Sequence, residues 1–190
     1  MSTAERIDPR SERTRRALRR VLFDLLFEQG WEAVNVRALC DRAGIGRSTF
    51  YLHFADKEDL LLSGFDELHR ELRAVAATED GAPLAFVRPL IEHVRTHDRV
   101  RCLVEKQSGH TVLRRLTQLV VELMQEEVAR LAPPSARRTA AAQYLAGSFV
   151  QLLFWWLNTR SRLTPAELAQ LYRKLSLPVL RTLRRVERKS

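Results

Sequence analysis

Apolar residues recur at helical spacing along almost the whole chain, and no stretch of useful length alternates as a β-strand would. The first apolar stripe predicts an amphipathic helix over residues 9–29, with arginines largely off the stripe. Gly30 is placed to end this helix as a C-cap. The stripe consists of Leu18, Val21, Leu22, Leu25 and Leu26. We therefore expect an all-α protein that begins with a surface helix.

Two short helices and a long one are predicted next. Asn35 can cap the first short helix, and Gly44 then breaks the chain before a second short helix over residues 47–53. Asp56 is a good N-cap for a long helix, which ends near a loop at residues 79–83. The front of the chain is therefore expected to hold three helices in quick succession, followed by one long helix.

Beyond that loop the same periodicity predicts further helices, over residues 84–96, 99–104, 111–131, 135–158 and 164–186. Thr164 and Glu167 form a capping box at the start of the last one, and Pro178 is expected to kink it. The total is about nine helices. We divide them into a three-helix N-terminal domain over residues 1–56 and a helical C-terminal domain over residues 57–190.

Composition narrows the class of protein. The formal net charge of +9 favours a polyanionic partner, either nucleic acid or an anionic membrane surface. The two cysteines, Cys40 and Cys102, can form neither a disulfide framework nor a four-ligand zinc site. The N-terminus has no apolar signal core, and the longest apolar stretch, residues 149–157, is too short to span a bilayer. We expect a cytoplasmic protein without a membrane segment.

Candidate catalytic and metal-binding residues are few. His93 and His97 stand four residues apart on one predicted helix, a spacing that can place two imidazoles on one metal, and Cys102 or His110 could add a ligand. A surface histidine pair near a helix end is the simpler account, so we predict no metal and no cofactor. The sequence has no nucleophile elbow and no glycine-rich phosphate loop, which argues against an enzyme.

Residues 36–54 carry the most informative pattern, two short helices that meet at a tight turn containing Gly44. Ile45 and Phe50 can anchor the second helix in a small core. This leaves small, hydrogen-bonding and basic residues exposed, the types that bind phosphates or read base edges. The candidate DNA-contacting residues are Arg37, Gly46, Arg47, Ser48, Thr49, Tyr51, His53 and Lys57.

The segment AGIGRSTFYLHFADKEDLL, residues 43–61, resembles the TetR family of bacterial regulators. The ordered matches are Ala43-Gly44, Thr49, Tyr51, His53-Phe54, Lys57-Glu58 and Leu60-Leu61. The resemblance covers about residues 11–62. It implies an Ω-shaped all-α dimer with a variable ligand-binding body. In the family, the residues matching Arg47, Ser48, Thr49, Tyr51, His53 and Lys57 typically touch DNA.

Departures from the family pattern concern the operator more than the fold. Asn35 stands where threonine is usual and keeps its capping role, whereas Gly46 replaces a frequent serine and removes its hydroxyl. The other two departures are Cys40, in place of alanine, and Leu52, in place of an aromatic residue.

A two-fold dimer would read a near-palindromic operator with half-sites roughly 34–36 Å apart. The N-terminal segment carries three arginines, Arg6, Arg10 and Arg13. They could form an arm that enters the minor groove, or a solvated basic face, which is the simpler account.

Residues 140–157 are apolar on nearly every face, so a helix there must be covered on both sides. It is either a core helix within one chain or a helix shared between the core and a second copy. The resemblance favours the second alternative, a homodimer through the last two long helices. The expected contact residues are Ala141, Leu145 and Ser148 on one helix and Tyr172 and Leu175 on the other.

The resemblance also implies a pocket inside the body for a small apolar or aromatic molecule. Binding there would shift the population toward a form whose DNA-reading helices are wrongly spaced, with the helix after Asp56 as the lever. Each candidate could equally be plain core: Phe65, His69, Phe86, Phe149, Gln151, Trp155 and Trp156. The sequence thus predicts a DNA-binding regulator, most simply a repressor released by a ligand. The alternatives are a regulator without an inducer and a helical enzyme that carries a helix-turn-helix.

Overall fold

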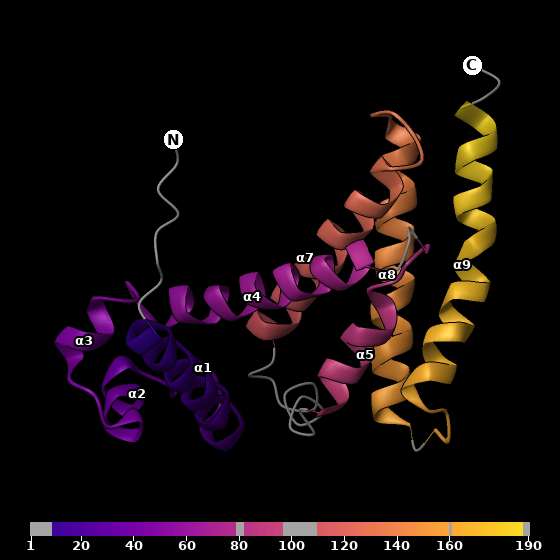
Figure 1. Cartoon of the computed structure of the whole chain (residues 1–190). Helices are drawn as coiled ribbons and strands as arrows, with labels where there is room; N and C mark the ends of the chain where they lie inside the picture. The colour runs from indigo at the N-terminus through magenta and orange to yellow at the C-terminus, as the bar shows by residue number, and fades with distance from the viewer. Residues whose placement is uncertain (1–8, 79–81, 97–109, 160, 188–190) are drawn as a thin grey trace, which may run out of the picture.

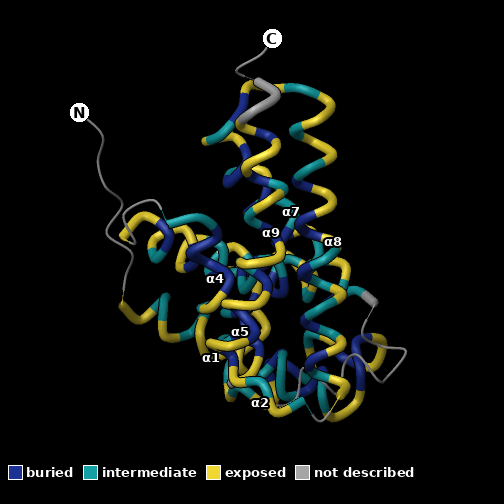
Figure 2. Tube along the Cα trace, turned by 90° about the vertical axis from the view of Figure 1, so that its right-hand side faces the viewer, coloured by how far each residue is buried: buried dark blue, intermediate teal, exposed yellow. Residues whose placement is uncertain are grey.

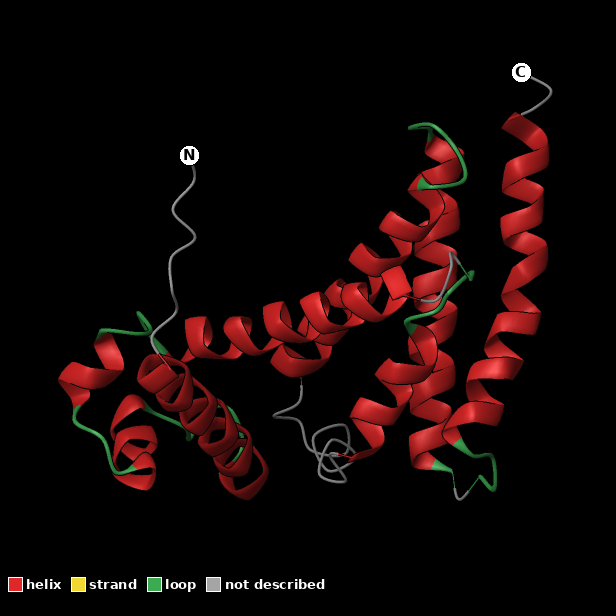
Figure 3. Cartoon of the chain, in the orientation of Figure 1, coloured by secondary structure: helices red, strands yellow, loops and turns green. Residues whose placement is uncertain are grey.

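The computed structural model describes residues 9–78, 82–96, 110–159 and 161–187, and these form eight helices without a strand (Figures 1 and 3). The helices are α1 (Pro9–Gln29), α2 (Val36–Ala43), α3 (Arg47–Tyr51), α4 (Lys57–Thr78), α5 (Val87–Thr96), α7 (His110–Ala129), α8 (Ala136–Asn158) and α9 (Pro165–Glu187). The all-α expectation is confirmed. The helix predicted over residues 99–104 lies outside the described residues.

The predicted helix starts are formed by the expected capping contacts. Asn35 Oδ1 accepts from the Ala38 N–H at 3.0 Å, and Asp56 Oδ1 accepts from the Asp59 N–H at 2.8 Å. At the start of α9, Glu167 Oε2 accepts from the Thr164 N–H at 2.8 Å, while Thr164 Oγ1 accepts from the Glu167 N–H at 3.3 Å. This reciprocal pair is a complete capping box. Local sequence therefore fixes where these helices begin.

Three helix boundaries differ from the expectation by two or three residues, one of them the end of α7 at Ala129 instead of residue 131. The helix expected from residue 84 begins at Val87, because residues 83–86 form a turn in which Leu84 has a φ of 58°. The helix expected to reach residue 53 ends at Tyr51. Helix α9 continues through Pro178 and changes direction partway along its length in Figure 1. A proline inside a helix removes one backbone hydrogen bond, which accounts for a bend.

The buried residues form two cores joined by α4, and along the helices buried positions alternate with exposed ones (Figure 2). We call the unit made by α1, α2, α3 and the first turns of α4 the head; its core includes Leu18, Phe50 and Leu60. The rest of the described chain is the body, whose larger core is built from α5, α7, α8, α9 and the later turns of α4. Phe65 on α4 packs against both cores. Figure 1 shows α4 as the long connection between them.

None of the described helices combines the length and the apolar character that crossing a membrane requires.

Candidate DNA-binding surface and helical body

The turn between α2 and α3 is built around Gly44. Its φ of 66° lies in the left-handed region, which glycine adopts at little cost. The N–H groups of Gly44 and Ile45 both donate to the Cys40 carbonyl, which ends α2 cleanly. Phe50 is fully buried in the head core and so fixes the inner side of α3. The opposite side of α3 is left facing solvent.

That outer side carries three of the eight predicted DNA contacts, Arg47, Ser48 and Tyr51. Tyr51 is 58% exposed and Leu52, which directly follows α3, is 81% exposed. Thr49 on α3 and His53, two residues beyond it, are partly buried. The exposed members of the predicted set are Arg37, Gly46, Arg47, Ser48 and Tyr51. The structure therefore gathers a guanidinium, hydroxyls and a phenol on one exposed helix, groups that bind phosphates and base edges.

Lys57 is the predicted contact that the structure uses differently. Its Nζ donates to the carbonyl oxygens of Trp31 at 2.9 Å and Val34 at 3.0 Å, and it lies 4.4 Å from the centroid of the Trp31 ring. The ammonium group therefore ties α4 to the loop between α1 and α2. A phosphate contact through its remaining hydrogen stays a prediction.

The remaining polar and basic groups of the head have specific surroundings. Burial raises the pKa of the Cys40 thiol, and the nearby Asp41 carboxylate adds to this, so Cys40 is a neutral packing group. Arg13 is exposed and lies within α1, as does Arg10, so neither belongs to an extended arm; the alternative of a helical basic face fits them better. Arg6 lies outside the described residues.

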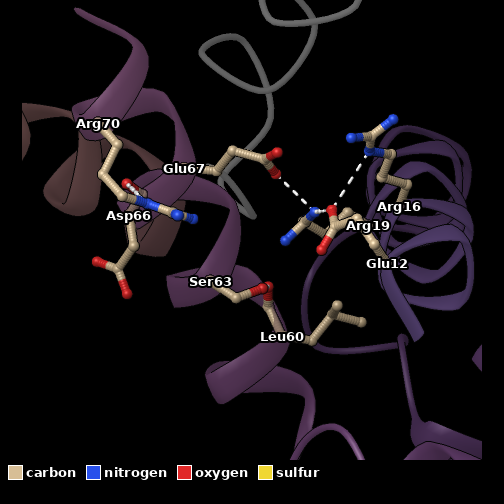
Figure 4. A network of polar contacts seen from close by, with 8 residues as sticks. All are labelled: Glu12, Arg16, Arg19, Leu60, Ser63, Asp66, Glu67 and Arg70. Carbon is tan, nitrogen blue, oxygen red and sulfur yellow. Dashed lines mark hydrogen bonds and ion pairs between the residues drawn. The ribbon is translucent and has the colours of Figure 1, made fainter. Parts of the chain in front are cut away.

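A buried guanidinium joins α1 to α4 (Figure 4). Arg19 Nη2 lies 2.9 Å from Glu12 Oε1 and 2.6 Å from Glu67 Oε2, and its side chain is only 10% exposed. Gly64 on α4 lies beside this side chain, and a Cβ there would be in ordinary van der Waals contact with Arg19 Cδ at 3.7 Å. Sequence reasoning missed this link, because Arg19 is one of many arginines along α1. The link sets the position of the head on α4.

Two family models match the chain. One, described as bacterial regulatory proteins of the tetR family, matches residues 20–63; the other, a transcriptional regulator C-terminal region, matches residues 83–177 and thus half of the chain. The chain belongs to the TetR family. The members of this family are DNA-binding transcription regulators without enzymatic activity.

Individual relatives agree with this assignment. The uncharacterized HTH-type transcriptional regulator YdeS of Bacillus subtilis (strain 168) is 26% identical over 89 residues, a match that covers 47% of this chain. The match covers 40% of YdeS, so this chain spans less than half the length of that relative.

Solved structures share the fold of this TetR-family chain. A TetR transcriptional regulator from Streptococcus agalactiae 2603V is 23% identical, with a TM-score of 0.59 over 88% of this chain and 95% of that one. NalD of Pseudomonas aeruginosa, the secondary repressor of the MexAB-OprM multidrug efflux pump, is 19% identical, with a TM-score of 0.56 over 89% and 97%. At 23% and 19% sequence identity, this similarity shows a shared fold and does not extend to function.

Within the body of this TetR-family chain, the predicted ligand-binding residues separate into two groups. Phe86 and Phe149 are buried in the body core and Phe65 is partly buried beside it, positions compatible with either core or pocket. Trp156, also in that core, donates from Nε1 to the Leu163 carbonyl at 2.8 Å. Gln151 and Trp155 are exposed on α8, with Trp155 at 44%. Their predicted place inside the body is wrong, because α8 turns this side outward.

His69 links two helices of the body. Its Nε2 lies 3.3 Å from Glu126 Oε1 and its Nδ1 lies 3.8 Å from Glu122 Oε2, both on α7. Glu126 is shared with Arg73, whose Nε lies 3.1 Å from Oε2. His69 therefore belongs to a polar contact between α4 and α7, and its predicted ligand contact stays a prediction.

The expected dimer contacts also need correction. Tyr172 Oη donates to the Leu145 carbonyl at 2.6 Å, and both residues are buried within one chain. Burial raises the pKa of Tyr172, so the phenol stays a neutral donor. The expectation that these two face a second copy is therefore wrong. Leu175, in contrast, is 64% exposed.

The histidine pair considered as a metal site is described only in part. His93 is partly buried on α5, while His97 and Cys102 lie outside the described residues. Within the part of the chain that the structure describes, no group of three or more His, Cys, Asp or Glu side chains could hold a metal ion.

Proposed function

We propose that this TetR-family regulator acts as a homodimeric repressor that leaves its operator when a small molecule binds the body. The observation that carries the proposal is the outer side of α3, which is exposed and is composed of hydrogen-bonding and basic groups around Arg47 and Tyr51. The head core holds this helix rigidly through Phe50, so the groups are presented in a fixed arrangement. Such an arrangement suits the major groove of an operator.

The outer face of α8 supports the dimer. From residue 139 to residue 158 the helix contains no charged residue, and its exposed positions include Tyr144, Gly147, Gln151 and Trp155. On α9, Leu171 and Leu175 are exposed one turn apart. An uncharged face with large apolar residues across two adjacent long helices is typical of an interface between copies. A second copy placed there gives two reading heads and a near-palindromic operator.

Helix α4 supports the coupling between ligand and DNA. It carries residues of both cores, Phe65 packs against both, and the Arg19–Glu67 contact at 2.6 Å fixes α1 to it. A ligand that shifts α4 within the body must therefore move the head. In a dimer this changes the distance between the two α3 helices, and a ligand that prefers the changed distance releases the operator.

The DNA-binding part of the proposal is tested with the DNA upstream of the protein's own gene. Fluorescence anisotropy compares the wild type, Arg47→Ala with Tyr51→Ala, and Arg114→Ala, an exposed arginine of the body that serves as the matched control. We expect the double variant to lose at least a hundredfold in affinity and the control to stay within about twofold. Equal binding by all three, with only a steep salt dependence, would show nonspecific charge attraction and refute sequence reading at α3.

Ligand release is tested on the same complex. A panel of small apolar and aromatic metabolites is screened for a rise in melting temperature, and each hit is then added to the protein–DNA complex. We expect at least one stabilising compound to dissociate the complex. Stabilising compounds that leave DNA affinity unchanged would refute release by ligand while leaving the DNA-binding part intact.

A further inference from the structure

A cavity of about 170 Å³ lies where the C-terminal half of α9 and the residues that follow α7 meet the turn before α5. Its apolar surface comes from Pro83, Leu131, Leu177 and Leu180. None of the residues predicted from sequence to bind a ligand lines it. A cavity of roughly 150 Å³ is large enough to hold benzene, so this one accommodates a single six-membered ring or a branched chain of similar size.

The polar lining of this cavity is mostly cationic. Arg130, directly after α7, and Arg181 and Arg184 on α9 contribute three guanidinium groups, against the single carboxylate of Glu127. Glu127 is already engaged, because its Oε1 accepts from the Leu84 N–H at 3.2 Å and its Oε2 lies 3.6 Å from Arg130 Nη1. Arg181 and Arg184 make no ion pair within the described part of the chain. The cavity therefore joins a partly buried apolar wall to an excess of exposed positive charge.

The wall formed by the turn before α5 is held in place by specific contacts. Leu84 has a φ of 58°, a left-handed conformation that is strained for a bulky residue, and the buried Glu127 carboxylate holds its N–H. Arg173 Nε donates to the Pro83 carbonyl at 3.0 Å and so ties α9 to the same turn. Strain of this kind persists only where surrounding contacts fix it, and it concentrates at binding sites.

We propose that this cavity binds one small organic carboxylate, with its ring or branched chain against the leucines and its carboxylate on Arg181 and Arg184. Guanidinium groups pair with carboxylates through two parallel hydrogen bonds, and the apolar wall excludes water from one side of that pair. The volume excludes nucleotides and long-chain lipids. The site does not depend on the proposed DNA binding or ligand release.

Benzoate is the probe, and its neutral and cationic counterparts are benzamide and benzylamine. Binding to the full chain is followed by isothermal titration and by the rise in melting temperature at constant ionic strength. We expect benzoate to bind saturably, and at least tenfold more tightly than either counterpart. No saturable binding of benzoate, equal binding of benzamide, or tighter binding of benzylamine would each overturn the proposal.

Two variants and one control locate the site. Arg181→Gln with Arg184→Gln removes the two guanidinium groups proposed to bind the carboxylate. Leu177→Phe fills the cavity without a change of charge. The control, Arg114→Gln with Arg162→Gln, removes two exposed arginines from other places in the body. We expect both test variants to bind benzoate at least tenfold more weakly and the control to match the wild type, with circular dichroism verifying the fold of each. Unchanged binding in either test variant, or equal loss in the control, would overturn the assignment.

Discussion

The head and the body of this protein expose different kinds of surface over similar helical cores. On α3 of the head, exposed Arg47, Ser48 and Tyr51 offer charge and hydrogen bonds. On α8 of the body, the chain from residue 139 to residue 158 has no charge at all. A polyanion is bound through charge and hydrogen bonds, whereas a protein partner requires a surface whose desolvation costs little free energy. The two surfaces are therefore suited to different partners, DNA and a second copy.

The largest expected effect separates the two cores. Phe50→Ala removes a fully buried ring from the head core and should lower the free energy of unfolding of the head by about 4 kcal/mol. Phe149→Ala is the matched change in the body core. Hydrogen exchange should quicken mainly in α1–α3 for the first variant and mainly in α8 and α9 for the second. The same exchange pattern in both variants would mean that the two cores do not unfold separately.

A smaller effect is expected at the joint between them. Arg19→Met leaves the carboxylates of Glu12 and Glu67 without their shared partner, and it should cost about 2 kcal/mol because both are only partly exposed. Arg16→Met is the control, since Arg16 pairs with the same Glu12 carboxylate but is 70% exposed, and it should cost less than about 0.5 kcal/mol. Urea denaturation measures both. Equal losses would show that burial of Arg19 contributes nothing.

The proposed dimer face should respond to a single charge. Tyr144→Glu places a carboxylate on the uncharged side of α8 and is expected to weaken self-association at least tenfold, about 1.4 kcal/mol. Tyr144→Phe keeps the ring and should leave association near the wild-type level. Sedimentation velocity over a range of concentrations measures both. A Tyr144→Glu protein that associates as the wild type does would place the interface elsewhere.

The smallest effect concerns the start of α9. The backbone N–H of Thr164, and then its hydroxyl, donate to Glu167 and lower the pKa of that carboxyl. Because the folded pKa lies below the ordinary value, this stabilisation is complete above the ordinary value and is lost as the pH falls through the folded one. Glu167→Gln should therefore slightly reduce the loss in melting temperature between pH 7 and about pH 3. Identical pH profiles would exclude a contribution from this capping box.

The features predicted correctly from sequence are those set by neighbouring residues. Asn35, Gly44 and Thr164 form hydrogen bonds with groups within five residues of themselves. The neighbouring sequence is therefore enough to predict these helix caps. The exposure of one side of α3 was predictable for the same reason, since apolar Phe50 anchors the short helix in the core and the neighbouring Tyr51 is left exposed.

The features that could not be predicted depend on distant partners. In residues 140–157 every helix face is apolar, so periodicity cannot tell that Leu145 points inward while Trp155 points outward. The contact between Glu127 and Leu84 joins residues 43 positions apart. Lys57 was predicted to contact DNA from its place at a helix start, but the carbonyls that it binds belong to a loop more than 20 residues earlier.

Helix α4 also determines how this protein can be recombined with others. Leu60 and Leu61 lie beyond residue 56, yet they belong to the head core. A transplanted head that stopped at residue 56 would lack part of its own interior and would fold poorly. Chimeras that exchange bodies between regulators should therefore be joined within α4 beyond Glu67, which keeps Leu61 and the Arg19–Glu67 contact with the head. In such chimeras the residues around Phe65 must pack against a body taken from another regulator while they remain part of the original head.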